Sequence, residues 1–164
     1  MTYKVPVSVK GICFENKQVW LRKNEREEWE LPGGKLDQGE QPEETVVREM
    51  EEELGLAVIP KTLLTADLYK IKTSSDEIKG VLVLAYLCEV IKRVSEFEWE
   101  CEAGVADFKL FGRDKIDDLN MPAFYKETIK QGFTKTFLSR FEIVGRKCRF
   151  GCGGCARRGW VVVA

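Results

Sequence analysis

The stretch from Gly34 to Leu56, GKLDQGEQPEETVVREMEEELGL, constrains the fold of this chain more than any other segment. Pro42 suits the first position of a helix, and Gly55 suits the left-handed residue that ends one. Helical spacing places four apolar residues on one face: Val46, Val47, Met50 and Leu54. The stretch therefore predicts a loop followed by a helix that ends near Leu54 and packs one side against a core.

The same helix carries an excess of negative charge. Glu49, Glu52 and Glu53 stand at i, i+3 and i+4, so they project from one face as a cluster. Like charges at that spacing destabilise a helix unless a positive charge lies among them. We expect a divalent cation in that place, and we expect Glu44 and Glu51 to be ordinary surface residues.

Composition narrows the chemistry that the chain can perform. There is no histidine, which excludes a Ser-His-Asp triad, a Cys-His pair and a histidine-ligated zinc site. Acid–base chemistry must use carboxylates, Lys, Tyr, Cys or metal-bound water. The 26 basic and 27 acidic side chains nearly balance, which does not favour a nucleic-acid-binding protein.

Neither a signal peptide nor an apolar run of the roughly 18 residues that span a bilayer is visible. We therefore expect a cytoplasmic protein with reduced cysteines and no membrane partner. Cys148, Cys152 and Cys155 are close enough in sequence to ligate zinc, but a structural zinc site usually needs four ligands. Free thiols in a C-terminal tail are the preferred interpretation.

The order of the predicted elements indicates an α/β protein of the α+β type. A strand over 3–14 and its return over 18–22 form a hairpin, and Pro32-Gly33-Gly34 forms a loop. The nearly continuous apolar run from Gly80 to Ile91 predicts a strand buried in the middle of a sheet. The remaining predicted elements are an extended segment over 63–71, a strand over 107–111, a turn or short helix over 113–119 and a helix opened by Pro122.

The last helix has an apolar face, and Gly132 is expected to weaken the helix locally. The residues of that face are Phe124, Ile129, Phe133, Phe137 and Phe141. We predict one domain over 1–141. Residues 142–164, rich in Gly, Arg and Cys, are too few to build a core unaided and form a tail.

The central stretch matches a known motif, the Nudix box G-x5-E-x7-R-E-U-x-E-E-x-G-U, in which U is an apolar residue. The matching residues are Gly34, Glu40, Arg48, Glu49, Met50, Glu52, Glu53, Gly55 and Leu56. All seven fixed positions are filled in register, and each has about a one-in-fifteen chance of occurring by accident. The chain thus resembles the Nudix hydrolases, and its element order is similar to theirs over roughly residues 3–141.

The resemblance implies a mixed β-sheet sandwiched between helices. It also implies hydrolysis of a pyrophosphate bond in a nucleoside diphosphate linked to another moiety, with Mg²⁺ or Mn²⁺ as cofactor. Glu49, Glu52 and Glu53 would be the metal ligands, with the carbonyl of Gly33 or Gly34 as an addition. Arg48 would orient these glutamates, and Glu40 would support them. This assignment is physically reasonable, because Mg²⁺ prefers oxygen ligands and bridges carboxylates to phosphates.

The general base is either a box glutamate or a glutamate of the acidic loop over 94–104. Three residues of that loop are candidates, and Glu102 is preferred over Glu98 and Glu100. We expect Glu102→Gln to lower turnover by about 10²-fold or more if Glu102 is the base.

Substrate contacts are expected from Gly33, Trp29 and Arg22. The aromatic candidates for stacking on a base are Trp29, Phe97, Trp99 and Tyr125. A nucleotide sugar such as ADP-ribose and a normal or oxidised nucleoside triphosphate both stay open as small-molecule substrates. The alternative is a catalytically silent Nudix-fold module that binds a nucleotide or a protein. Either would be a monomer or a homodimer.

Overall fold

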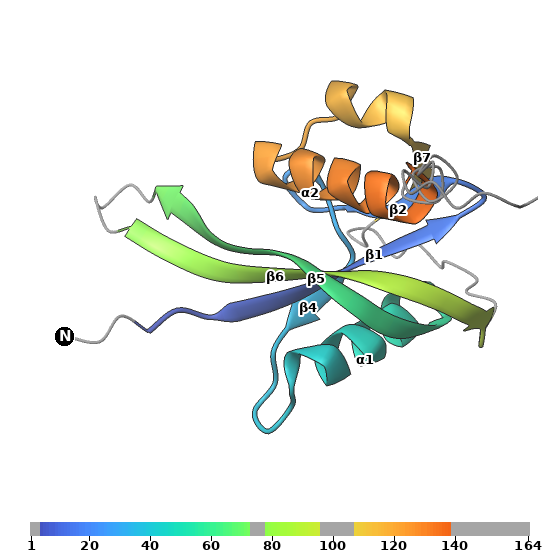
Figure 1. The fold of residues 1–164 in the computed structure, drawn as a ribbon. Helices are drawn as coiled ribbons and strands as arrows, with labels where there is room; N and C mark the ends of the chain where they lie inside the picture. Colours follow the sequence, from blue (N-terminus) through green and yellow to red (C-terminus); the bar gives the residue numbers. More distant parts are fainter. Residues whose placement is uncertain (1–3, 73–77, 96–106, 139–164) are drawn as a thin grey trace, which may run out of the picture.

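The computed structural model describes residues 4–72, 78–95 and 107–138 (Figure 1). Its strands are β1 (Val7–Glu15), β2 (Gln18–Lys23), β3 (Trp29–Glu30), β4 (Gly33–Lys35), β5 (Leu56–Lys72), β6 (Ile78–Arg93) and β7 (Phe108–Gly112). Its helices are α1 (Pro42–Leu54), the 3-10 helix η1 (Arg113–Asp118), α2 (Ala123–Phe133) and the π-helical turn η2 (Thr134–Leu138).

The sheet is mixed, as predicted. Its strand order is β3-β2-β1-β6-β5, with β4 also paired to β1 and β7 to β2. Strands β1 and β6 run parallel, and the other pairs are antiparallel. The apolar run predicted to be a central strand is β6, which lies between β1 and β5.

Helices α1 and α2 cover opposite faces of the sheet (Figure 1). Strand β1 contributes side chains to both faces, because successive side chains of a strand point to opposite sides. Val9 and Cys13 pack in the cluster that contains Val46 and Met50 of α1. Ile12 packs instead in the cluster that contains Ile129 of α2. The predicted sandwich of a sheet between helices is confirmed.

Helix α1 begins and ends where the sequence predicts. Pro42 occupies its first position, and Gly55 follows it with φ +63°. Glu44 is exposed as predicted, but it also caps the helix: its carboxylate accepts the backbone N–H of Gln41 at 2.8 Å. Glu44 is thus a surface residue, as predicted, with an added role in capping the helix.

Strand β5 is longer than predicted, since it starts at Leu56 directly after the helix. The first half of β5 was not predicted because Pro60 interrupts the strand pattern of the sequence. The pairing with β6 shifts register between Pro60 and Thr62. A proline cannot donate a ladder hydrogen bond, so it is tolerated at such an irregularity. Strand β1 starts at Val7, later than predicted.

Gly132 was predicted only to weaken the last helix, and that prediction was incomplete. A Cβ atom at Gly132 would lie 3.2 Å from Cγ2 of Ile12 and 3.4 Å from Cζ of Phe14. The missing side chain therefore lets α2 approach β1 closely. No helix within the described ranges is long and apolar enough to cross a membrane. Residues 142–164 lie outside those ranges, so the tail stays a prediction.

Candidate active site

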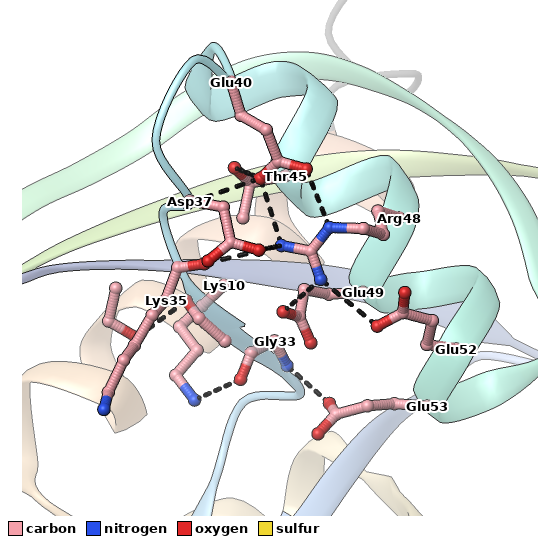
Figure 2. Close-up of polar contacts among 12 residues, drawn as sticks. Lys10, Gly33, Lys35, Asp37, Glu40, Thr45, Arg48, Glu49, Glu52 and Glu53 are labelled. Atoms are coloured by element: carbon pink, nitrogen blue, oxygen red, sulfur yellow. Dashed lines mark hydrogen bonds and ion pairs between the residues drawn. The ribbon is translucent and has the colours of Figure 1, made fainter.

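The site forms where the segment between β3 and α1, called the glycine loop below, lies against the helix (Figure 2). The sequence predicted a loop at Pro32-Gly33-Gly34, but Gly33 and Gly34 pair with β1 and begin the short strand β4. Gly33 has φ +126°, and a Cβ atom there would lie 2.2 Å from the carbonyl oxygen of Val9. Only glycine tolerates both conditions. The backbone N–H of Gly33 donates to Oε2 of Glu53 at 2.6 Å. The loop is thereby tied to the last turn of α1.

Gly34 makes a second close approach to the helix. A Cβ atom at Gly34 would lie 2.2 Å from Oε1 of Glu49, so the Glu49 carboxylate occupies the space that a side chain would fill. The second glycine of the pair thus allows a carboxylate to lie against the backbone of the loop.

Arg48 joins several of the acidic residues (Figure 2). Its Nε and Nη2 donate to the two oxygens of Glu40 at 2.8 and 3.0 Å. Its Nη1 donates to Oε1 of Glu49 at 2.8 Å and to Oε2 of Glu52 at 3.1 Å. The hydrogen bonds from Arg48, together with that from Thr45, lower the pKa of Glu40 to about 2. Arg48 therefore fixes the relative positions of three glutamates.

Glu53 is largely enclosed, like Glu49, whose side chain is 13% exposed. The Glu53 side chain is 17% exposed, and its Oε1 accepts Nη1 of Arg22 at 2.9 Å. Burial raises the pKa of Glu53, although the Gly33 N–H and Arg22 oppose that effect. The Nε of Arg22 is buried and has no hydrogen-bond partner among the described residues. Within the described part of the chain, one buried N–H of Arg22 is thus left without a hydrogen bond beside the site.

Lys10 of β1 contacts the backbone carbonyl of Gly33. Its Nζ donates to the Gly33 carbonyl oxygen at 2.9 Å, and it lies 3.7 Å from Oε1 of Glu30. Burial lowers the pKa of Lys10. The sequence analysis missed Lys10 and Glu30, because a charged residue in a strand is usually exposed and no local pattern marks these two as buried partners.

The oxygen donors of the cluster fit a hard divalent cation such as Mg²⁺ or Mn²⁺. The carboxylate of Glu49 against Gly34 is a further point of fit. As the side chains lie, however, no group of three acidic, histidine or cysteine residues within the described ranges is arranged to hold a metal. Nη1 of Arg48 lies instead between Glu49 and Glu52. The side chain of Glu52 is 59% exposed.

Two hollows flank the cluster. A wide, open one of about 830 Å³ lies beside α1 and includes Arg48 and Glu52. A smaller one of about 150 Å³ lies on the other side of the sheet, and we call it the α2-side pocket. Its lining includes Ser8, Lys10, Glu30, Tyr69, Val83 and Tyr125. Because Lys10 contacts Gly33, this pocket adjoins the glycine loop, which lies against the carboxylates of α1.

The predicted substrate contacts fall in different places. Arg22 and Gly33 lie in the cluster, whereas Trp29 packs edge-on against Phe111 with ring centroids 4.6 Å apart. Tyr125 lines the α2-side pocket, as does Tyr69, which the sequence analysis did not select. Glutamates 98, 100 and 102, and the aromatic residues Phe97 and Trp99, lie outside the described residues.

A mixed sheet between two helices, with a glycine loop leading into an acidic helix, defines a class of α+β protein whose charged site lies at the loop–helix junction. The model of one such family, the NUDIX domain, matches residues 4–132. The chain belongs to the Nudix family.

Similar proteins agree with that assignment. An 8-oxo-dGTP diphosphatase of Proteus vulgaris is 35% identical over 66 residues, which are 37% of this chain and 59% of that protein. An RNA pyrophosphohydrolase of Tolumonas auensis is 43% identical over 54 residues, 32% of this chain and 31% of that protein. The chain thus matches less than two thirds of the length of these curated relatives.

A solved structure confirms the fold. The crystal structure of a MutT protein from Methanosarcina mazei superposes with a TM-score of 0.62, covering 83% of this chain and 99% of that one. Its sequence identity is 19%, so this likeness concerns the fold alone.

Proposed function

We propose that this chain hydrolyses a pyrophosphate bond in a nucleoside diphosphate linked to another moiety, with Mg²⁺ or Mn²⁺ bound by Glu49, Glu52 and Glu53. One observation carries the proposal. The Glu49 carboxylate fills the space beside Gly34, and the Glu53 carboxylate accepts the Gly33 N–H, so the carboxylates and a bare glycine backbone converge. The carbonyl of Gly34 would be an additional ligand.

The charges of the site suit a polyanionic substrate. A bound divalent cation would neutralise charge on the pyrophosphate and so favour attack by water at phosphorus. Arg48 positions Glu49 and Glu52 through its hydrogen bonds. Arg22 supports Glu53 through its Nη1 and adds positive charge beside the carboxylates.

The remaining assignments concern the general base and the substrate. Glu102 stays our preferred base. A nucleotide sugar, a nucleoside triphosphate and an oxidised nucleoside triphosphate all present the required pyrophosphate. The name of the Proteus relative supports the last of these, and that of the Tolumonas relative, an RNA pyrophosphohydrolase, adds an RNA that carries a pyrophosphate bond. We further propose that the protein acts in the cytoplasm.

A second candidate function is a catalytically silent module that binds a nucleotide or a protein. The specific observation in its favour is that Nη1 of Arg48 lies between Glu49 and Glu52, where it already balances their charge. In such a module this arginine would replace a metal permanently.

A phosphate-release assay separates the two functions. The panel would contain ADP-ribose, dGTP, oxidised dGTP and triphosphate-ended RNA with Mg²⁺, each with wild-type protein and with Glu52→Gln. Products that are not free phosphate would be read by chromatography. Glu52 is largely exposed, so its replacement should not disturb folding. We expect hydrolysis of at least one substrate and a loss of about 100-fold or more in the variant. Absent hydrolysis, or equal rates for both proteins, would favour the silent module.

A further inference from the structure

The α2-side pocket lies between the central strands and the start of α2. Ser8 and Lys10 come from β1, Tyr69 from β5, Val81 and Val83 from β6, and Pro122 and Tyr125 from the start of α2. Lys10 also holds the Gly33 carbonyl, so one side chain contacts both the pocket and the glycine loop. A ligand in the pocket would therefore adjoin a phosphate group bound at the loop.

The size of the pocket limits what it can hold. Its volume is about 150 Å³. Sites for whole drug-sized ligands usually enclose about 300–1,000 Å³, whereas an apolar cavity of about 150 Å³ accepts a molecule such as benzene. The pocket thus suits one ring system of a substrate whose remaining atoms lie outside it.

The walls of the pocket suit a flat ring. Val81 and Val83 supply apolar surface from β6. The rings of Tyr69 and Tyr125 both contact Phe124, with centroids 5.5 and 4.1 Å apart. Because Phe124 holds both tyrosines, they form a preformed aromatic wall against which a heterocycle can stack.

Glu30 and Lys10 place an acceptor and a donor side by side in the lining. Their charged atoms are 3.7 Å apart, which is an ion pair but longer than a hydrogen bond. Lys10 uses one of its three N–H donors on Gly33. The Glu30 carboxylate makes no hydrogen bond to the described residues, and the side chain is 19% exposed. Both groups can therefore still bond to a ligand.

We propose that Glu30 and Lys10 select the ring of the substrate and that they favour a guanine-type base. Guanine presents two adjacent N–H donors beside a carbonyl. The two oxygens of Glu30 can accept both donors, and the Lys10 ammonium can donate to the carbonyl. Adenine and cytosine present an amino group beside an unprotonated ring nitrogen, and uracil presents one N–H, so each would leave part of the pair unused. This inference rests on the proposed function, because it names the substrate class of the same site.

Calorimetric titration with GMP, AMP, CMP and UMP, without metal, tests the inference. Monophosphates contain no pyrophosphate, so binding is measured apart from turnover. We expect GMP to bind at least about 10-fold more tightly than the others, and Glu30→Gln to weaken GMP binding by about 10- to 100-fold, as for a hydrogen bond to a charged group. Glu25→Gln, an exposed carboxylate in the neighbouring loop, is the matched control and should bind like wild type.

The inference is overturned if no monophosphate binds, if another base binds as tightly as GMP, or if Glu30→Gln retains full GMP affinity. Should Glu30→Gln not fold, the ranking of the four nucleotides by wild-type protein still decides. GMP selectivity without any hydrolysis would overturn the proposed function alone. Hydrolysis without GMP selectivity would overturn the present inference alone.

Discussion

The two sides of the sheet differ in how closely their charged side chains are paired. On the α1 side, Arg48 bonds to Glu40, Glu49 and Glu52 within 3.1 Å, and Glu53 is bonded to the loop backbone and to Arg22. On the α2 side, Lys10 and Glu30 are 3.7 Å apart beside a pocket. Tight mutual pairing fixes side chains, whereas loose pairing leaves hydrogen-bonding capacity for a ligand. The α1 side thus has charged side chains held in a fixed geometry, whereas Lys10 and Glu30 on the α2 side retain hydrogen-bonding capacity for a ligand.

The α1 side could be predicted from the sequence because its determinants are local. The start at Pro42, the stop at Gly55 and the apolar face all lie within the 23 residues from 34 to 56. Helical spacing alone brings Glu49, Glu52 and Glu53 to one face. The approach of Gly33 to Glu53 joins residues 20 positions apart in the chain, and helical spacing does not predict it. Only the resemblance to the Nudix hydrolases placed a glycine carbonyl beside these carboxylates.

The α2 side could not be predicted, because distant segments build it. Its pocket combines β1, β3, β5, β6 and α2, and the parallel register that sets Lys10 opposite Ala85 appears only in the folded sheet. In the sequence, Lys10 and Glu30 are ordinary polar positions of strands. The packing role of Gly132 could not be predicted either, because it depends on contacts with Ile12 and Phe14, which lie far away in the chain.

The largest effect on this contrast is expected from Arg48→Lys. An ammonium group cannot reproduce the planar set of donors that joins three glutamates, so the carboxylates should lose their relative positions. If the proposed hydrolysis is correct, kcat should fall by about 100-fold, as for residues that orient metal ligands. Steady-state kinetics on the substrate found by the panel measures this loss.

The matched control for that change is Arg113→Lys on the α2 side. Arg113 is exposed and begins η1, outside both the carboxylate cluster and the α2-side pocket. Its replacement should leave kcat within about twofold, because surface substitutions away from such features have small effects. Equal losses in the two variants would mean that the two sides do not differ in the way described above.

A smaller effect is expected from Gly34→Ala, which tests the close approach of Glu49. The added Cβ atom would meet the Glu49 carboxylate at 2.2 Å and displace it. We expect kcat to fall by about 10-fold or more, because small misplacements of a positioned group are costly in catalysis. Calorimetric titration with Mn²⁺ should show weaker binding in the same variant.

Gly39→Ala provides the control for Gly34→Ala, since it separates backbone strain from displacement of the carboxylate. Gly39 has φ +94°, but a Cβ atom there would meet nothing within 4 Å. The strain should lower the free energy of unfolding by about 1–3 kcal/mol while kcat stays unchanged. A loss of activity in Gly39→Ala equal to that in Gly34→Ala would show that loop strain, not contact with Glu49, controls activity.

The smallest effect is expected from the pH dependence of stability, which can show whether the tight pairing is confined to the α1 side. Hydrogen bonds from Arg48 and Thr45 lower the pKa of Glu40 from its usual 4.5 to about 2. A lowered carboxyl pKa means that the folded state binds the proton less readily than the unfolded chain, so Glu40 stabilises the fold fully above pH 4.5. That stabilisation is lost as pH falls through about 2.

The difference in melting temperature between wild type and Glu40→Gln should therefore be constant at neutral pH and should shrink between pH 4.5 and about 2. Tyr125→Phe is the α2-side control, because burial raises the pKa of the Tyr125 phenol and that group does not titrate in acid. Its difference from wild type should be flat over the same interval. A Glu40→Gln difference that is equally flat would mean that Arg48 does not hold Glu40 in solution, and the contrast between the two sides of the sheet would lose its main support.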